Sequence, residues 1–253
     1  MPEEILKSEK VIVALFLLSL SLMSCRSVAQ EHKKLPNDME WVSKSIEYAA
    51  LCKQVYSMAW PVVKENTKSI TENWTVVLDV DETVLNNIQY AIERVQVDSG
   101  FTQQSWSKWV QREEAPPLSG VTSFLDSVRT LGAYAHVAFI TNRMFSNEDA
   151  TIANLKKFGL YKDGDVMLTR KSHQDTKEDR RRALEEGTGR CAANGPMKLV
   201  ALFGDNIRDF MPMRGREKAA HYRSEELAKD PRWGTKYFVL PNPRYGSWER
   251  DYR

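Results

Sequence analysis

Residues 76–84, with the sequence VVLDVDETV, constrain the fold more than any other stretch, because an apolar strand here ends in Asp79 and Asp81. Besides this strand, at residues 74–80, apolar runs predict four more strands, at residues 136–141, 166–168, 199–203 and 237–240. Helical patterns alternate with them at residues 121–131, 147–158, 177–186 and 224–229. Short apolar strands that alternate with helices are typical of a parallel sheet covered on both faces. We therefore expect an α/β fold.

Two segments stand outside this alternation. Residues 38–60 carry apolar side chains at helical spacing, which predicts one amphipathic helix with Asp38 as N-cap and Pro61 limiting its end. Residues 86–118 follow the first strand directly and contain two tryptophans and a Pro-Pro pair, and we interpret them as an inserted cap segment. A chain of 253 residues suits one large domain, at residues 38–253, with such an addition.

The N-terminal residues have the pattern of an export signal. Residues 11–23 form an almost unbroken apolar run after two lysines, which is short for a bilayer span and typical of a signal peptide. The run ends in LMSC at Cys25, which resembles a bacterial lipobox, whose cysteine is lipidated. We expect residues 1–25 to be a lipoprotein signal peptide and residues 26–37 a polar tether. A plain cleaved signal and an uncleaved anchor stay open as alternatives.

Location and partners follow from a few further residues. Arg26 rather than Asp follows Cys25, which favours the outer membrane, on a face that the sequence leaves open. The net charge of +2 is too small to argue for a nucleic-acid polymer as partner. The other two cysteines, Cys52 and Cys191, lack CxxC spacing, so no zinc or redox site is expected. The sequence does not decide whether they form a disulfide.

The aspartate pair after the first strand suits phosphoryl transfer. The carboxyl edge of a parallel sheet is where ligands bind, and positions i and i+2 of a strand share a side, so Asp79 and Asp81 would converge if the strand geometry persists. One carboxylate can attack phosphorus while the other protonates the leaving oxygen and then activates water. Because both partners are anionic, a hard cation such as Mg²⁺ is expected to screen them. A Walker-B reading is disfavoured, since no GxxxxGK[ST] loop is present.

The later strands end in residues that complete such a site. The second ends in AFITNR, where Thr141 and Asn142 are candidates to hold phosphate oxygens. Lys177 opens a predicted helix and is a candidate to neutralise the phosphate and the nucleophile. The fourth strand ends in GDNIRD, in which Asp205 and Asp209 are candidate metal ligands.

The motif order resembles the haloacid dehalogenase superfamily of phosphohydrolases, in its four-aspartate acid phosphatase branch. The closest similarity is to the class C acid phosphatases and 5′-nucleotidases of the outer-membrane lipoprotein e family, on the motifs DVDETVLNN, SWSKWV, AFITNR, KEDRRR, LFGDNIRDF and LPNPRYGSWE. The resemblance implies a Rossmann-like parallel sheet flanked by helices, with a small, mainly helical cap subdomain. It also implies an Mg²⁺-dependent acid phosphatase that hydrolyses phosphate monoesters through an aspartyl-phosphate, and we expect nucleoside 5′-monophosphates as its substrates.

By this resemblance the site residues take specific roles. Asp79 would be nucleophile and metal ligand, and Asp81 the acid/base with its carbonyl on Mg²⁺. Asp205 would be the third protein ligand, and Asp209 would support it or hold a metal-bound water. Thr141 and Asn142 would bind phosphate together with Lys177, for which Lys171 is the competing choice.

Substrate preference is less constrained. Aromatic rings stack on bases, and Tyr245 and Tyr90 are the candidates to hold a nucleoside, although a place in the cap core explains each ring equally well. The alternatives are a broad-specificity acid phosphatase without nucleotide preference and a non-enzymatic surface lipoprotein that binds, for instance, haem or a host ligand. A homodimer is also left open.

Overall fold

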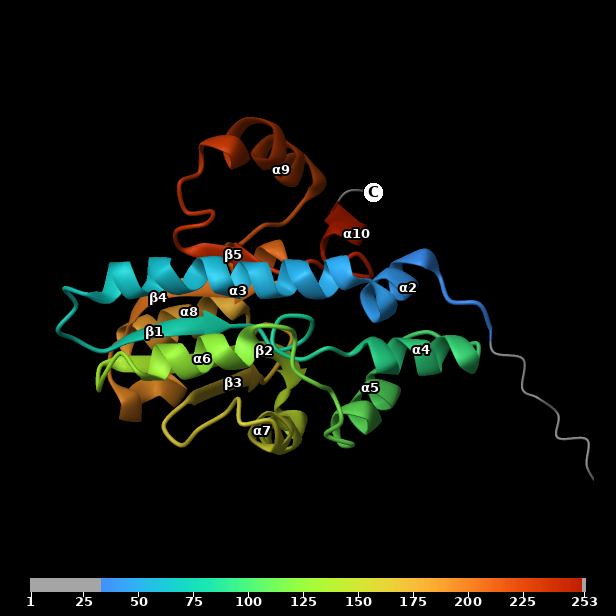
Figure 1. Ribbon diagram of the computed structural model, residues 1–253, viewed down its shortest axis with the longest axis horizontal. Coiled ribbons are helices and arrows are strands. Elements are labelled where there is room, and N and C mark those ends of the chain that lie inside the picture. The colour runs from blue at the N-terminus through green and yellow to red at the C-terminus, as the bar shows by residue number, and fades with distance from the viewer. Residues whose placement is uncertain (1–32, 252–253) are drawn as a thin grey trace, which may run out of the picture. The chain divides into compact units, whose positions relative to one another are not determined.

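A five-stranded, all-parallel sheet lies at the centre of the fold, in the strand order β3-β2-β1-β4-β5 (Figure 1). The structure is a computed structural model that describes residues 33–251. The strands are β1 (Trp74–Leu78), β2 (Ala135–Met144), β3 (Val166–Arg170), β4 (Lys198–Gly204) and β5 (Tyr237–Val239). All five predicted strands are present, and the predicted α/β fold is confirmed. The predicted signal peptide with Cys25, and most of the tether, lie outside the described residues.

Helices connect the strands and cover both faces of the sheet. The α-helices are α2 (Asn37–Lys44), α3 (Ile46–Thr67), α4 (Ile88–Gln96), α5 (Gln103–Val110), α6 (Val121–Arg129), α7 (Glu148–Lys157), α8 (Lys177–Glu186), α9 (Arg216–His221) and α10 (Trp248–Asp251). Short 3₁₀ turns are η1 (Phe145–Asn147), η2 (Gly189–Asn194), η3 (Ile207–Asp209) and η5 (Leu227–Lys229), and η4 (Tyr222–Glu226) is a π-helical turn.

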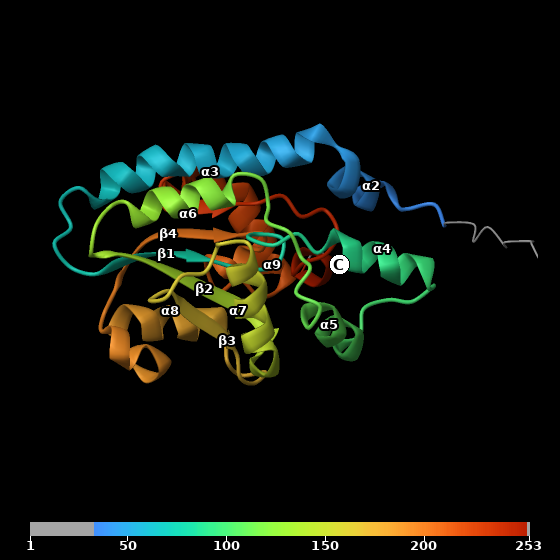
Figure 2. The ribbon, with the colours of Figure 1, turned by 60° about the horizontal axis from the view of Figure 1, so that its bottom comes forward.

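Alternating strand residues divide the core into two layers. Val76 and Leu78 of β1 pack in the cluster formed with α3 and α6, whereas Val77 packs in the cluster that contains Leu184 of α8. This alternation follows from the two-residue period of a strand. Figure 2 shows α3 and α6 above the sheet and α8 below it. Because both faces are covered, β1 is buried along its whole length.

Helices α4 and α5 lie within residues 86–118, the segment interpreted as a cap. They sit beyond the carboxyl ends of the strands (Figures 1 and 2). Thr102 begins α5 with a capping box, in which its side chain and that of Ser105 each accept from the other's backbone N–H. Trp109 of α5 is buried and donates to Asn87 Oδ1 over 2.8 Å, which ties the two cap helices to the loop after β1.

The single N-terminal helix predicted for residues 38–60 is wrong in two respects. Ser45 has an extended backbone and separates α2 from α3, and its side chain accepts from the N–H of Tyr48 as an N-cap. Pro61 does not end the helix, which continues to Thr67. Proline costs one helical hydrogen bond, but Val63 and Thr67 beyond it are buried, so core packing favours the continued helix.

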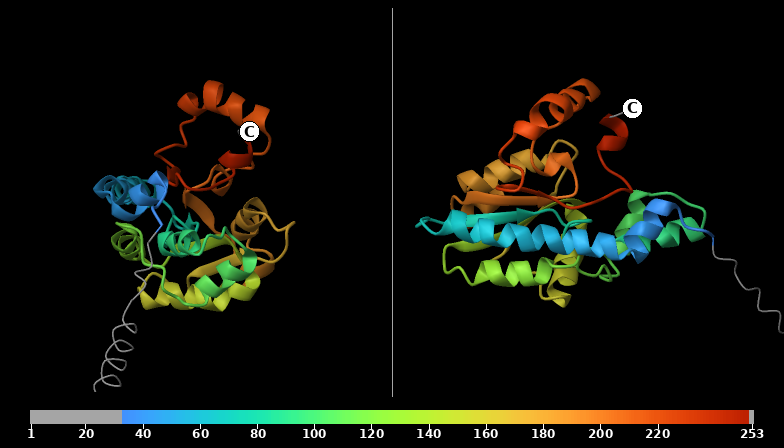
Figure 3. Two further views of the ribbon diagram at one scale, coloured as in Figure 1. Left: turned by 90° about the vertical axis from the view of Figure 1, so that its right-hand side faces the viewer. Right: turned by 45° about the horizontal axis from the view of Figure 1, so that its top comes forward.

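The helix predicted for residues 224–229 is also displaced. Helical structure begins earlier, at Arg216, and passes from α9 through the π turn η4 to the 3₁₀ turn η5. Ala219 and Tyr222 bury against Met213 in a small separate cluster, and this burial lies before the predicted start. The segment extends from the β5 edge of the sheet (Figure 3).

The described residues give two further results. Cys52 and Cys191 are free, buried thiols in different core clusters, so no disulfide joins them. Among residues 33–251, no helix is both long and apolar enough to cross a membrane.

Candidate active site

The loops after β1 and β4 bring three carboxylates together at the carboxyl edge of the sheet. One carboxylate oxygen each of Asp79, Asp205 and Asp209 lies within 4.8 Å of the other two. Asp79 directly follows β1, and its backbone N–H donates to Phe203 O of β4 over 2.9 Å, which fixes it beside the second loop. The site therefore depends on two neighbouring strands that end at the same edge.

Lys177 neutralises part of this negative charge. Its Nζ lies 2.5 Å from an oxygen of Asp79 and 2.5 Å from one of Asp209, and its side chain is only 6% exposed. Thr176 begins α8 with a capping box to Asp179, so the lysine occupies the first helical position and points to the sheet edge. Lys171, the competing choice, instead lies over the ring of Phe145.

Gly204 lets Asp209 approach the end of β4. A Cβ atom built on Gly204 would lie 2.3 Å from the Cβ and Oδ2 of Asp209, closer than any real contact. Asp209 Oδ2 also accepts from the N–H of Asn206 over 3.0 Å, which closes the turn. Residue 204 must therefore lack a side chain for the triad to form.

Burial and neighbouring charges shift the pKa values of Asp79, Asp205 and Lys177. Burial is the main cause that raises the pKa of Asp79 to about 7, with Lys177 opposing the rise and Asp209 and Asp81 adding to it. Burial, together with Asp209 and Asp79, raises the pKa of Asp205 well above its usual value. Burial lowers the pKa of Lys177, but Asp209 and Asp79 outweigh it and leave that pKa raised.

The triad has the donor set of a divalent cation site. Three carboxylates face one ammonium group, which leaves an excess of two negative charges if all are ionised. Carboxylate oxygens are the ligands that hard divalent cations take in proteins. Asp205 is further oriented by Asn242, whose Nδ2 donates to its Oδ2 over 2.7 Å. The residues therefore fit a bound divalent cation.

Asp81 lies outside the triad, in a separate set of contacts. Strand β1 ends at Leu78, so the strand geometry does not continue to Asp81. Its Oδ1 accepts from Arg143 Nη2 over 2.7 Å and from Asn87 Nδ2 over 3.0 Å. Asp79 and Asp81 nevertheless line the same cavity.

The two candidate phosphate ligands of β2 are placed differently. Asn142 lines the cavity, and its Oδ1 accepts from Arg180 Nη2 over 2.9 Å. Thr141 is buried, its hydroxyl accepts from the N–H of Arg143, and it is not among the residues that line the cavity. Arg180, in turn, donates to Thr141 O over 2.5 Å, so α8 holds this strand end in place.

A cavity of about 860 Å³ opens above these groups and reaches the cap segment. Such a volume is typical of small-molecule sites. Both candidate stacking residues line it: Tyr245 is 39% exposed, whereas Tyr90 is 7% exposed and packs edge-on against Trp106 at 5.0 Å between ring centroids. Phe101 also lines the cavity and is 65% exposed.

Sequence reasoning missed two charged residues of this region. Arg143, whose side chain is fully buried, holds Asp81; its position after Thr141 and Asn142 at a strand end was the available signal. Glu82 is buried at 1% exposure and accepts from the hydroxyl of Tyr245. No spacing rule connects residues so far apart in the chain.

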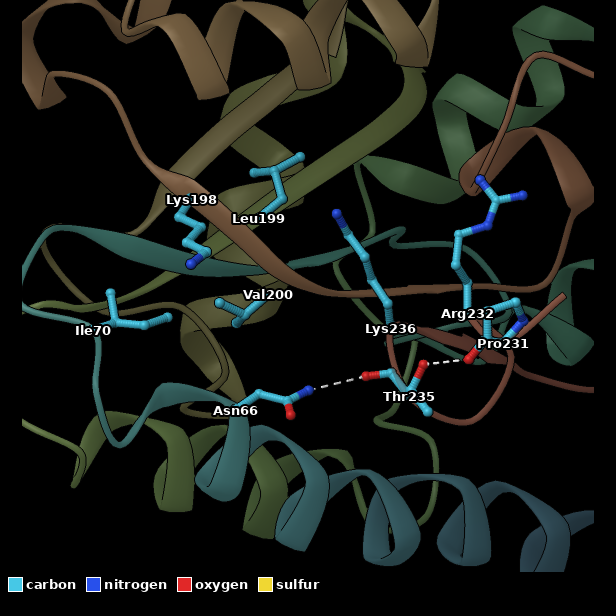
Figure 4. Close-up of a pocket in the computed structure, with 9 residues that line it drawn as sticks. All are labelled: Asn66, Ile70, Lys198, Leu199, Val200, Pro231, Arg232, Thr235 and Lys236. Carbon is cyan, nitrogen blue, oxygen red and sulfur yellow. Dashed lines mark hydrogen bonds between the residues drawn. The ribbon is translucent and has the colours of Figure 1, made fainter.

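A second cavity, of about 510 Å³, lies at the opposite edge of the sheet (Figure 4). Its lining comes from segments that precede or begin strands, and includes Lys198, Arg232 and Lys236. Asn66 donates to Thr235 O across it over 3.2 Å. Among the described residues that line it there is no carboxylate, whereas the triad lines the first cavity.

The fold and the site together define a protein of the HAD, or haloacid dehalogenase, superfamily. Within it, the chain belongs to subfamily IIIB, the acid phosphatases, whose family model matches residues 12–248. The family expected from the motifs is therefore confirmed.

Solved structures and relatives agree with this family. The chain is similar to the class C acid phosphatase from Bacillus anthracis, in two structures, one with tungstate bound: 27% identity, a TM-score of 0.71, and coverage of 85% of this chain and 88% of that chain. Acid phosphatase 1 of Solanum lycopersicum is 28% identical over 67% of this chain and 57% of its own length. A stem 31 kDa glycoprotein of Glycine max is 24% identical over 70% of this chain and 61% of its own length. The chain thus spans about three fifths of the length of these relatives.

The raised pKa values predict how a cation stabilises the protein at different pH. Between its unfolded and folded pKa values, a carboxyl group with a raised folded-state pKa is protonated only in the folded state, so the stability that Asp79 contributes without metal falls as pH rises from about 4 to about 7. At pH 5 Mg²⁺ must displace the proton of Asp79, whereas above pH 7 that carboxyl group is already ionised. We expect the rise in melting temperature caused by Mg²⁺ to be larger at pH 7.5 than at pH 5. Each additional kcal/mol in the free energy of unfolding adds about 2–4 °C.

Melting curves with Mg²⁺ and with EDTA at both pH values measure this difference. The Asp205→Asn variant should lose most of the Mg²⁺ effect. Asp163→Asn is the matched control, because its side chain is 98% exposed and lies outside the triad. Equal Mg²⁺ effects at the two pH values would contradict the account.

Proposed function

We propose that this chain is an Mg²⁺-dependent acid phosphatase that hydrolyses phosphate monoesters through an aspartyl-phosphate on Asp79. The observation that carries the proposal is the carboxylate triad, with Asp79 and Asp209 buried, Asp205 half-buried and Lys177 in contact with both buried members, in the lining of a cavity. Membership of the acid phosphatase subfamily supports it, and a solved relative binds tungstate, an oxyanion of phosphate-like shape.

In the first half-reaction a carboxylate oxygen of Asp79 attacks phosphorus and the bond to the leaving oxygen breaks. Lys177 stabilises the charge that the transferred group carries, and Asp81 gives its proton to the leaving oxygen. A bound Mg²⁺, held by Asp79, Asp205, Asp209 and the carbonyl of Asp81, would supply charge screening between the two anions. Asn142 and Lys177, which line the cavity, are proposed to orient the phosphate, and Thr141, whose hydroxyl is buried, to hold the backbone at Arg143.

In the second half-reaction water attacks phosphorus, Asp81 takes the water proton, and Asp79 is released as a carboxylate. Arg143 donates to the carboxylate of Asp81 over 2.7 Å, which holds that side chain at the cavity where it can accept the water proton.

For the substrate we propose nucleoside 5′-monophosphates. The cavity extends from the triad to Tyr90 and Tyr245, and Tyr245 has the more exposed ring on which a base can stack. A broad-specificity acid phosphatase is the second candidate, because the phosphate site is the same. Release of phosphate from adenosine 5′-monophosphate (AMP), nicotinamide mononucleotide and an aryl phosphate, with and without EDTA, separates the two. A non-enzymatic binding lipoprotein predicts no release from any of them.

Substitution of Asp79 and of Asp81, the two aspartates of the first motif, should have different effects on kcat and on Mg²⁺ affinity. Asp79→Asn should lose more than about 10³-fold in kcat and also bind Mg²⁺ more weakly, since it removes both nucleophile and ligand. Asp81→Asn should lose roughly 10²–10⁴-fold in kcat, the size of a general acid–base contribution, and keep its Mg²⁺ affinity. Initial rates with AMP and Mg²⁺ titrations measure both, with the exposed Asp126→Asn as control. Retained turnover in Asp79→Asn would remove its role as nucleophile.

We also propose that the chain is exported and attached to the outer membrane through a lipid on Cys25, after removal of the signal peptide. The support is the apolar run of residues 11–23 and the LMSC sequence that ends it. In cells, Cys25→Ser should move the protein from the membrane to the soluble fraction. Membrane fractionation and the mass of the N-terminal peptide test this. An unprocessed N-terminus in the wild type would contradict the proposal.

A further inference from the structure

Glu82 is a buried carboxylate that no step of the proposed reaction uses. It follows Asp81 directly, has a left-handed backbone (φ 55°), and is 1% exposed. One oxygen, Oε1, accepts from the N–H of Asn87 over 3.1 Å, and the other, Oε2, accepts from the hydroxyl of Tyr245. A buried charge is costly unless it is paired and hydrogen-bonded, and Arg244 supplies the pairing, with Nη1 3.6 Å from Oε1.

These contacts join the two ends of the loop between β1 and α4 to a segment that lies far along the chain. Glu82 belongs to the loop after β1, Asn87 precedes cap helix α4, and Tyr245 comes from the segment after β5. Tyr245 lines the cavity and keeps 39% of its surface exposed, although its hydroxyl end is held at Glu82. The guanidinium of Arg244 lies 5.5 Å from the centre of the same ring. The ring is thus fixed at its hydroxyl end and remains accessible from the cavity.

We infer that Glu82 is a positioning residue, which fixes the ring of Tyr245 at the cavity wall and thereby sets a preference for substrates with an aromatic group beyond the phosphate. The inference rests on the proposed function and adds the residue that determines selectivity. Stacking of one base on an aromatic side chain contributes about 1–3 kcal/mol, and only a ring held in place supplies this without an ordering cost.

The Glu82→Gln substitution removes the arrangement with little change in shape. A carboxylate has two acceptor oxygens, whereas an amide has one oxygen and a donating nitrogen. The amide therefore cannot accept from both Asn87 and Tyr245, and it has no charge to pair with Arg244. The ring of Tyr245 loses its charge-assisted anchor, because an amide offers its hydroxyl only a weaker, neutral hydrogen bond, while the nucleophile and the triad keep their side chains.

The test compares AMP with glycerol phosphate, because both have an alkyl leaving oxygen and only AMP carries an aromatic base. Glu82→Gln should lower the ratio of kcat/KM for AMP to that for glycerol phosphate by about 10-fold, through a higher KM for AMP. Tyr245→Phe, which keeps the ring and loses the hydroxyl, should lower the ratio in the same direction. Glu82→Gln should add nothing further in a Tyr245→Ala background, because no ring is left to position.

Adenosine binding, measured by calorimetry, provides a readout that does not need turnover. Glu82→Gln should weaken it about 10-fold, and the surface control Glu114→Gln, whose side chain is 50% exposed and outside the cavity, should not change it. If the wild type releases no phosphate but Glu82→Gln still weakens adenosine binding, the proposed function fails and this inference holds. A wild type that does not bind adenosine, or a Glu82→Gln variant that binds it normally, would overturn the inference. An equal loss of kcat on both substrates would also overturn it, because it would place Glu82 in the chemical step.

Discussion

The contact of Lys177 with Asp79 and Asp209 is the interaction on which the candidate site depends. Three carboxylates in one cluster, two of them buried, repel one another and lose hydration, so their negative charge must be matched by cations or protons. One buried ammonium 2.5 Å from two of them reduces the imbalance but leaves it unresolved. The remaining negative charge favours binding of a divalent cation. The bound cation and Lys177 together would then attract an anionic phosphate.

The rest of the fold holds this cluster in place. The parallel arrangement of β1 and β4 puts Asp79 beside the loop of Asp205 and Asp209, and the absence of a side chain at Gly204 lets that loop close. Capping of α8 at Thr176 fixes the position from which Lys177 reaches the cluster. The loop after β1 is also held by two side-chain contacts, from Trp109 of the cap segment and from Tyr245 of the segment after β5. These two segments contribute to the lining of the cavity.

The sequence predicts the centre of the site well, because strand periodicity and topology determine where a strand-end residue lies. Asp79, Asp205 and Asp209 all follow apolar strands, and parallel strands end at one edge. Lys177 could be placed only through the motif order. Side-chain pairings across long separations had no such signal: the pairing of Asp81 with Arg143 and the contact of Glu82 with Tyr245 depend on how loops pack. The helix errors have the same origin, since burial of Val63 and Thr67 extends α3 beyond Pro61 where local propensity predicts an end.

The most direct test of the account is to find the phosphoryl group on Asp79. Protein mixed with Mg²⁺ and AMP is quenched in acid during turnover, and the acyl phosphate is then reduced with borohydride, which converts the phosphorylated aspartate to homoserine. The account predicts homoserine at position 79 in the peptide mass spectrum, and none when EDTA replaces Mg²⁺ or when AMP is left out. Phosphate release with an unmodified Asp79 under conditions that trap acyl phosphates, or homoserine at another aspartate, would contradict it.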